Sequence, residues 1–81
     1  MAVINMREMK DNQVGTIEKV KVGGELGQRI REMGLVPGTP FKVIGRAPLK
    51  DPVALRVKGF KLTLRNSEAD YIDVEVRDES A

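Results

Sequence analysis

A chain of 81 residues is one domain at most, and a chain this short buries only about 60 to 65% of the surface that its unfolded form exposes. Apolar residues make up 41% and charged residues 32%, which excludes a disordered protein. The chain has no Cys and no His, which excludes disulfides, thiolate nucleophiles, imidazole bases and the usual zinc ligands. A thin core makes a deep catalytic cleft hard to build, so we expect a binding module and no enzyme.

The net charge of +2 is unevenly spread along the chain. Residues 40–65 hold seven basic residues and one acidic residue, whereas residues 66–81 hold one basic and six acidic residues. Opposite charges on neighbouring strands stabilise a sheet, so we expect these two segments to pair. A nucleic-acid-binding basic face is the less favoured interpretation.

The first residues, MAVINMREMKDNQ, lack the long apolar run of a secretory signal. No stretch of the chain approaches the roughly 20 apolar residues of a membrane span. We therefore expect a cytoplasmic location.

The N-terminal segment predicts one helical turn and then a strand. Asn5 followed by Glu8 has the spacing of a capping box that opens a helical turn, and the methionines of that turn are expected to cover the core. From Thr16 to Val22 polar and apolar residues follow a period near two, which predicts the first strand. Gly15 is expected to mark a bulge in it.

A helix is predicted over residues 24–33. Leu26, Ile30 and Met33 fall at positions i, i+4 and i+7, which is the stripe of an amphipathic helix. Gly34 follows, and helices commonly end at a glycine in the left-handed conformation.

Two loops and a strand follow the helix. Residues 36–39, Val-Pro-Gly-Thr, fit a type II turn. FKVIGRA, residues 41–47, alternates as a second strand, in which Gly45 allows a bend. APLKDP, residues 47–52, is predicted to be an exposed loop, because its prolines cannot complete a central strand ladder.

The C-terminal half has the clearest strand pattern. VALRVKGFKLTLR, residues 53–65, predicts a hairpin that turns at Lys58-Gly59, with one apolar and one basic face. Asn66 is expected to cap a short helical turn, residues 71–77 form the last strand, and residues 78–81 form a polar tail. Five short strands with one helix after the first predict a mainly β fold, a small partly open barrel, with its core over about residues 5–77 of a single 1–81 domain.

Four segments occur in one order: VGTI, GGELGQRIREMGLVPGT, APLKDP and VKGFKLTLRNSEADYIDV. Together they resemble the FeoA family of bacterial ferrous iron transport accessory proteins, from about residue 5 to residue 76. The resemblance implies an SH3-like barrel and a role beside the ferrous iron transporter FeoB, through its cytosolic GTP-binding region. The same fold is similar to the C-terminal domain of metal-dependent repressors, so a regulatory or nucleic-acid-binding SH3-like module is the alternative.

The surface expected to bind the partner is the edge formed by the predicted helix, residues 34–39 and the APLKDP loop. Prolines there present apolar surface without needing backbone donors. Leu35 has an alternative, because a hydrophobic residue beyond a glycine cap often folds back on its own helix. The candidate partner-binding residues are Arg29, Glu32, Leu35, Val36, Pro48 and Leu49.

No cofactor, catalytic residue or DNA partner is expected. Ferrous iron and zinc sites usually contain imidazole or thiolate, whereas this chain offers Met33 and carboxylates, so only a weak Fe²⁺ or other divalent metal site stays open. The only aromatic residues are Phe41, Phe60 and Tyr71, and both phenylalanines fall in the apolar phase of their strands, so the chain is poor in the stacking platforms of single-strand binders. The carboxylates considered as ligands are Glu25, Glu32, Asp51, Glu68 and Asp70.

Overall fold

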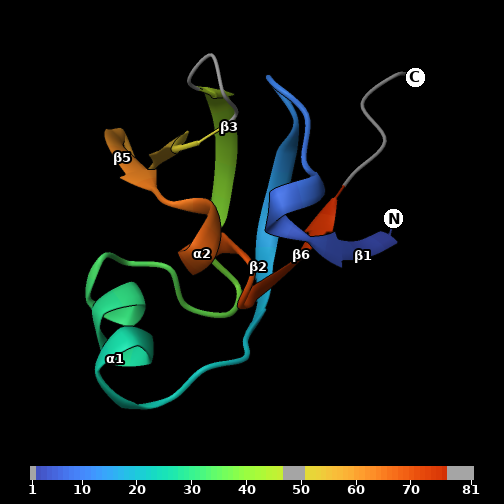
Figure 1. Ribbon diagram of the computed structural model, residues 1–81. Coiled ribbons are helices and arrows are strands. Elements are labelled where there is room, and N and C mark those ends of the chain that lie inside the picture. Colours follow the sequence, from blue (N-terminus) through green and yellow to red (C-terminus); the bar gives the residue numbers. More distant parts are fainter. Residues whose placement is uncertain (1, 47–50, 77–81) are drawn as a thin grey trace.

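The computed structural model describes residues 2–46 and 51–76, which form one antiparallel sheet with short helices (Figure 1). The strands are β1 (Ala2–Asn5), β2 (Val14–Val20), β3 (Pro40–Arg46), β4 (Val53–Val57), β5 (Phe60–Leu64) and β6 (Ile72–Val76). The helices are α1 (Gly24–Glu32), α2 (Asn66–Ala69) and the 3-10 turn η1 (Met6–Glu8). The strand order is β1-β6-β2-β3-β4-β5, so β1 and β5 form the two ends of the sheet and lie on opposite sides of the molecule (Figure 1).

The mainly β, partly open architecture is confirmed, but the predicted count of five strands is wrong. The sheet has six strands, because Ala2–Asn5 pairs with β6 in a register that runs from Ala2↔Val76 to Asn5↔Asp73. Residues 2–5 read AVIN, three apolar residues in succession, so they lack the alternation of apolar and polar residues that predicts a strand. The helix α1 therefore follows the second strand of the chain and not the first.

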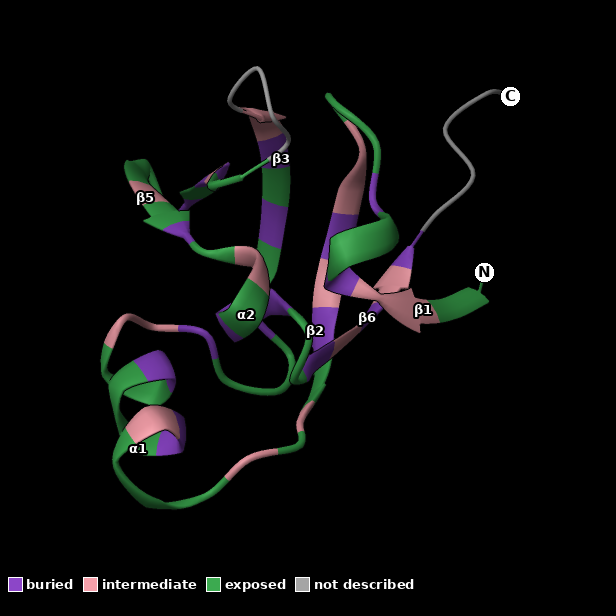
Figure 2. Cartoon of the chain, viewed as in Figure 1, coloured by how far each residue is buried: buried purple, intermediate pink, exposed green. Residues whose placement is uncertain are grey.

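The buried residues of the strands and of the helical segments form one hydrophobic core, and Figure 2 shows buried residues alternating with exposed ones along β3. Alternate side chains of β3, β4 and β6 face this core, as their period of two requires. The capping box of Asn5 and Glu8 is present, and the two methionines of the turn are buried, as predicted. The buried core side chains are Met6, Met9, Ile17, Ile30, Leu35, Phe41, Val43, Val53, Leu55, Val57, Leu64, Ala69, Ile72, Val74 and Val76.

The bulge predicted at Gly15 is in the wrong place. Gly15 pairs regularly with Phe41 on one side and Val76 on the other, and the register of β2 shifts between Ile17 and Lys19. A Cβ at position 15 would lie 3.1 Å from the carbonyl oxygen of Glu75 and 3.3 Å from Cζ of Phe41. Close packing against its neighbours, and not a bulge, requires the glycine.

The C-terminal end of α1 forms the motif that its sequence predicts. Gly34 has a φ of 95°, its N–H donates to the carbonyl of Arg31 over 2.9 Å, and the N–H of Leu35 donates to the carbonyl of Ile30 over 3.3 Å. These two bonds define a Schellman motif, which brings the residue after the glycine back against the last turn of the helix. Ile30 and Leu35 are both fully buried.

The loop before β3 is described in full, and the loop after it only in part. The N–H of Thr39 donates to the carbonyl of Val36 over 3.0 Å, which confirms the turn over residues 36–39. The register of β3 against β4 shifts between Val43 and Gly45, so the strand bends where the glycine was expected to allow it. Residues 47–50 of the predicted APLKDP loop lie outside the described residues.

The β4–β5 hairpin is confirmed, whereas the predicted cap of the next helical turn is wrong. Lys58 and Gly59 both have positive φ, 51° and 86°, as a two-residue turn with the twist of the sheet requires. Asn66 is the first residue of α2, and Arg65 is its N-cap. The backbone N–H of Arg65 donates to Oε1 of Glu68 over 2.9 Å, so the acidic side chain satisfies the start of the helix.

The predicted pairing of the basic segment with the acidic segment is wrong. The acidic strand β6 lies between β1 and β2, and the basic strands β3, β4 and β5 pair with one another at the other end of the sheet. The sheet is therefore divided by charge, and the basic half has no acidic strand beside it.

Candidate interaction surfaces

The two candidate residues of α1 lie on its exposed side. Nη2 of Arg29 is 3.3 Å from Oε2 of Glu68, whose side chain is only 10% exposed, so this ion pair holds α1 against α2. Glu32 accepts a hydrogen bond from Nε2 of Gln28 one turn earlier, over 3.3 Å. Both side chains are accessible to a partner, but Arg29 also has a structural role.

Leu35 is a core residue, so its prediction as a partner contact is wrong. Its side chain is 0% exposed, whereas Val36 is 39% exposed. The Schellman motif explains the difference, because it directs the first residue after Gly34 inward and releases the second to the surface. Pro48 and Leu49 lie outside the described residues.

Phe60 is an exposed residue that its strand phase did not predict. It begins β5, directly after the turn, and is 46% exposed. A Cβ on Gly34 would lie 4.0 Å from its Cζ atom, so the ring lies over the end of α1. We call Gly34, Val36 and Phe60 the Gly34 patch. One signal in the sequence points to this patch: Phe60 adjoins the hairpin turn, where a strand extends beyond the elements that cover its face.

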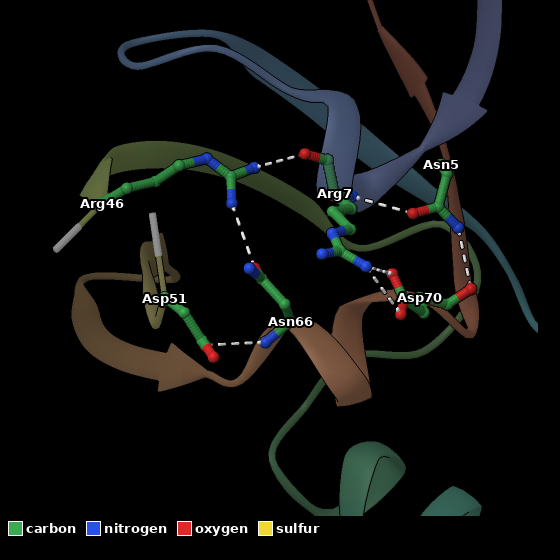
Figure 3. A network of polar contacts seen from close by, with 6 residues as sticks. All are labelled: Asn5, Arg7, Arg46, Asp51, Asn66 and Asp70. Carbon is green, nitrogen blue, oxygen red and sulfur yellow. Dashed lines mark hydrogen bonds and ion pairs between the residues drawn. The ribbon is translucent and has the colours of Figure 1, made fainter. Parts of the chain in front are cut away.

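Arg46 joins β3 to the turn η1 (Figure 3). Its Nη2 atom donates to the carbonyl oxygens of Arg7 over 2.9 Å, Met9 over 3.0 Å and Met6 over 3.3 Å. Its Nη1 atom lies 3.4 Å from Oδ1 of Asn66. The guanidinium group thus supplies the donors that the end of a helical turn lacks, so Arg46 acts as a structural residue.

Further polar contacts tie η1 to α2 (Figure 3). Nη1 of Arg7 lies 3.2 Å from each carboxylate oxygen of Asp70, and Nδ2 of Asn5 donates to the carbonyl of Asp70 over 2.8 Å. Oδ1 of Asp51 accepts from the backbone N–H of Asn66 over 2.9 Å. A partly open hollow of about 700 Å³ lies beside this network, lined by Arg7, Glu8, Met9, Lys10, Asp11, Arg46 and Asn66.

The carboxylates considered as metal ligands do not gather. Within residues 2–46 and 51–76, no group of three Asp or Glu side chains is placed to hold a metal ion. Asp51, Glu68 and Asp70 each bind a backbone N–H or an arginine instead. A weak divalent metal site therefore stays a prediction without identified ligands.

The outer face of the basic strands carries a row of three cations. Lys42 of β3 lies directly opposite Arg56 of β4, and Arg56 lies directly opposite Lys61 of β5. All three side chains are exposed. The ion pairs of the described residues join Arg7 with Asp70, Lys21 with Asp73 and Arg29 with Glu68, so none involves these three residues, which we call the cation row.

None of the helices in the described part of the chain combines the length and apolarity needed to cross a membrane.

Comparison with known proteins assigns the family. The profile described as FeoA domain matches residues 4–76. A curated relative, the Fe(2+) transport protein A/Fe(2+) transporter FeoB fusion protein of Porphyromonas gingivalis, is 34% identical over 73 residues, which are 90% of this chain and 9% of the fusion protein. The chain therefore spans less than a tenth of the length of that relative.

Solved structures support the assignment. The NMR structure of an FeoA-like protein from Clostridium acetobutylicum has a TM-score of 0.88 and 35% identity, and covers 98% of this chain and 92% of that chain. The zinc complex of FeoA from Stenotrophomonas maltophilia, described as a procaryotic SH3 domain protein, has a TM-score of 0.77, 24% identity and 89% coverage of both chains, and supports the SH3-like fold. The chain thus belongs to the FeoA family, which is associated with ferrous iron transport.

Proposed function

We propose that this domain is a non-catalytic accessory module of ferrous iron transport that binds the cytosolic GTP-binding region of an FeoB-type transporter. The observation that carries the proposal is the fusion protein, in which a region 34% identical to this chain is joined to an FeoB transporter. Joining two proteins in one chain raises their effective concentration to the millimolar range, which favours a weak direct contact.

The Gly34 patch is the proposed contact surface for the transporter, with Arg29 and Glu32 at its rim. Val36 and Phe60 are 39% and 46% exposed, and exposed aromatic and aliphatic side chains are common anchors of protein interfaces. Two anchors make a small interface, which is typical of transient complexes. Pro48 and Leu49 remain candidate contacts by sequence alone.

A chemical-shift titration of the ¹⁵N-labelled domain with the cytosolic domain of the transporter tests this proposal. We expect shifts concentrated at Gly34, Val36 and Phe60, and a roughly tenfold weaker affinity for Phe60→Ala, since truncating an interface anchor typically costs more than 1 kcal/mol.

The matched control is Val3→Ala, which removes an exposed apolar side chain from β1, at the far end of the sheet. Val3→Ala should leave the affinity unchanged. Equal losses for Phe60→Ala and Val3→Ala would place the contact elsewhere, and absence of binding at millimolar concentration would reject the proposed partner.

A further inference from the structure

The strand β5 is an open edge of the sheet. It pairs with β4 alone in the described part of the chain, and Figure 1 shows it at the side of the molecule away from β1. In a two-residue hairpin the closing pair, Val57↔Phe60, exchanges hydrogen bonds, and bonded and non-bonded pairs then alternate. The backbone groups of Lys61 and Thr63 therefore point outward, and no hydrogen bond from them to other loops or turns exists within residues 2–46 and 51–76. Such an edge can accept another strand.

The outer face of this edge favours an acidic neighbour. Lys61 ends the cation row of Lys42 and Arg56, in which like charges face each other directly. Directly opposed like charges destabilise a sheet, and an opposite charge at the next place in the row relieves this. The next place in the row is on a strand that this sheet does not contain.

The inner face of the same edge favours an apolar neighbour. Phe60 is 46% exposed, and Leu62 is half-buried at the border of the core. Both lie on the face opposite to that of Lys61, because side chains alternate along a strand. An added strand with an acidic residue opposite Lys61 would therefore place its flanking residues beside Phe60 and Leu62, and those residues should be apolar.

The sheet already contains one pairing of this kind. On β6 the acidic Asp73 lies opposite Lys19 of β2, and its neighbours on β6 are the buried Ile72 and Val74. Asp73 also forms an ion pair with Lys21 at 3.0 Å. The sequence of β6, IDVEV, therefore has the pattern of acidic and apolar residues that we expect in a strand that pairs with β5.

We propose that the edge of β5 is a docking site for an extended segment of a partner protein, in which an acidic residue faces Lys61 and the residues on either side of it are apolar. The backbone of Lys61 and Thr63 supplies hydrogen bonds to the segment, and the alternating side chains supply selectivity, as in other cases of strand addition. This site shares the side chain of Phe60 with the Gly34 patch, but its hydrogen bonds and its charge selectivity come from the backbone of Lys61 and Thr63 and from the side chain of Lys61, so it stands whether or not the transporter proposal holds.

The probe for this site is an acetylated and amidated peptide with the sequence of residues 71–76, YIDVEV. Titrated into the ¹⁵N-labelled full chain, it should shift the amide signals of Lys61 and Thr63 and slow their hydrogen exchange at least several-fold, because their N–H groups become hydrogen-bonded. In Lys61→Glu the affinity for this peptide should fall roughly tenfold. A second peptide, YIKVKV, should show the reverse preference and bind Lys61→Glu more tightly.

The matched control is Lys10→Glu, which makes the same change of net charge at an exposed lysine away from β5. It should bind both peptides as the unchanged chain does. Equal effects of the two substitutions, or shifts on the basic face without slowed exchange at Lys61 and Thr63, would show a diffuse charge contact and overturn the proposal. Slowed exchange confined to β1 and β2, where the peptide would replace β6, would also overturn it. So would tighter binding of a short oligonucleotide, which would assign the cation row to nucleic acid.

Discussion

Arg46 of β3 donates a hydrogen bond to the carbonyl of Met9 over 3.0 Å, although 37 residues separate them in the sequence. The same nitrogen reaches the carbonyls of Met6 and Arg7. One strand residue therefore fixes the turn whose methionines cover the core.

Arg46→Ala should destabilise the domain by about 1 to 3 kcal/mol, because three carbonyl groups lose their shared charged donor and water replaces it only in part. Arg46→Lys should lose less, since one ammonium group can reach some of these oxygens. Urea denaturation measures the free energy of unfolding of both variants. Arg56→Ala, at an exposed arginine of the neighbouring strand, is the control, and an equal loss there would contradict the role of Arg46.

Gly27→Ala should destabilise the domain although it improves helix propensity. Alanine is favoured over glycine in a helix by about 1 kcal/mol. At position 27, however, a Cβ would overlap the backbone carbonyl group of Val22, and overpacking costs about 1 to 3 kcal/mol; because a rigid backbone atom is the one overlapped, we expect a cost in the upper part of this range, which exceeds the gain in propensity. In Gly45→Ala the Cβ would meet nothing within 4 Å, so thermal unfolding should show little change; a Gly27→Ala chain as stable as Gly45→Ala would refute the packing argument.

Leu35→Ala and Val36→Ala should have opposite effects on folding and binding. Leu35 is 0% exposed, so its truncation should cost about 2 to 5 kcal/mol of stability. Val36 is 39% exposed, so its truncation should change stability by less than about 0.5 kcal/mol and weaken binding to the transporter. Urea denaturation measures the stability of the two variants, and titration with the transporter domain measures their affinity. A Leu35→Ala chain as stable as the unchanged chain would show that Leu35 is not a core residue.

Lys58→Asn should stabilise the β4–β5 hairpin. Lys58 has a φ of 51°, a left-handed conformation that costs most side chains about 1 kcal/mol or more and asparagine less. Asn-Gly is also the preferred sequence of this turn. We expect a gain of about 0.5 to 1 kcal/mol in thermal unfolding, and no such gain for Lys58→Gln, which removes the same charge. An equal gain for both variants would attribute the effect to charge.

Arg56→Glu should stabilise the sheet by placing an acid between two cations. Lys42 and Lys61 lie directly opposite it on either side, and each new opposite-charge pair contributes about 0.2 to 1 kcal/mol. The gain should shrink as salt is added, because screening weakens exposed pairs. Arg56→Gln only removes the repulsion, so it should give a smaller gain in stability than Arg56→Glu at every salt concentration. Urea denaturation at low and high salt measures both gains. A gain for Arg56→Gln as large as that for Arg56→Glu would exclude the charge explanation.

Local signals in the sequence predict local structure well in this domain. The position of Gly34 predicts the end of α1, Lys58-Gly59 predicts the hairpin, and the alternation of residues 72–76 predicts β6. Each of these features depends on residues within one turn or one strand, so propensity and period are sufficient to find them.

Which strands become neighbours depends on the whole chain and has no such signal. The acidic strand β6 pairs with β2 and β1, 50 or more residues away in the sequence, and not with the basic hairpin that precedes it. The phase of Phe60 correctly gives its face of the sheet, but phase does not tell whether another element covers that face. For the same reason the exposed Gly34 patch and the function of Arg46 required the structure.

The pairing of β1 with β6 places Ala2 directly opposite Val76, so the first and last described strands end at one corner of the domain, within about 5 Å of each other. This corner is at the other end of the sheet from β5. A chain that continues from Ala2 or from Val76 leaves the sheet at this one corner, away from the β5 edge. A larger protein joined through Ala2 or through Val76 would therefore start from the same corner of the sheet in either order, and neither order would bring it to the β5 edge.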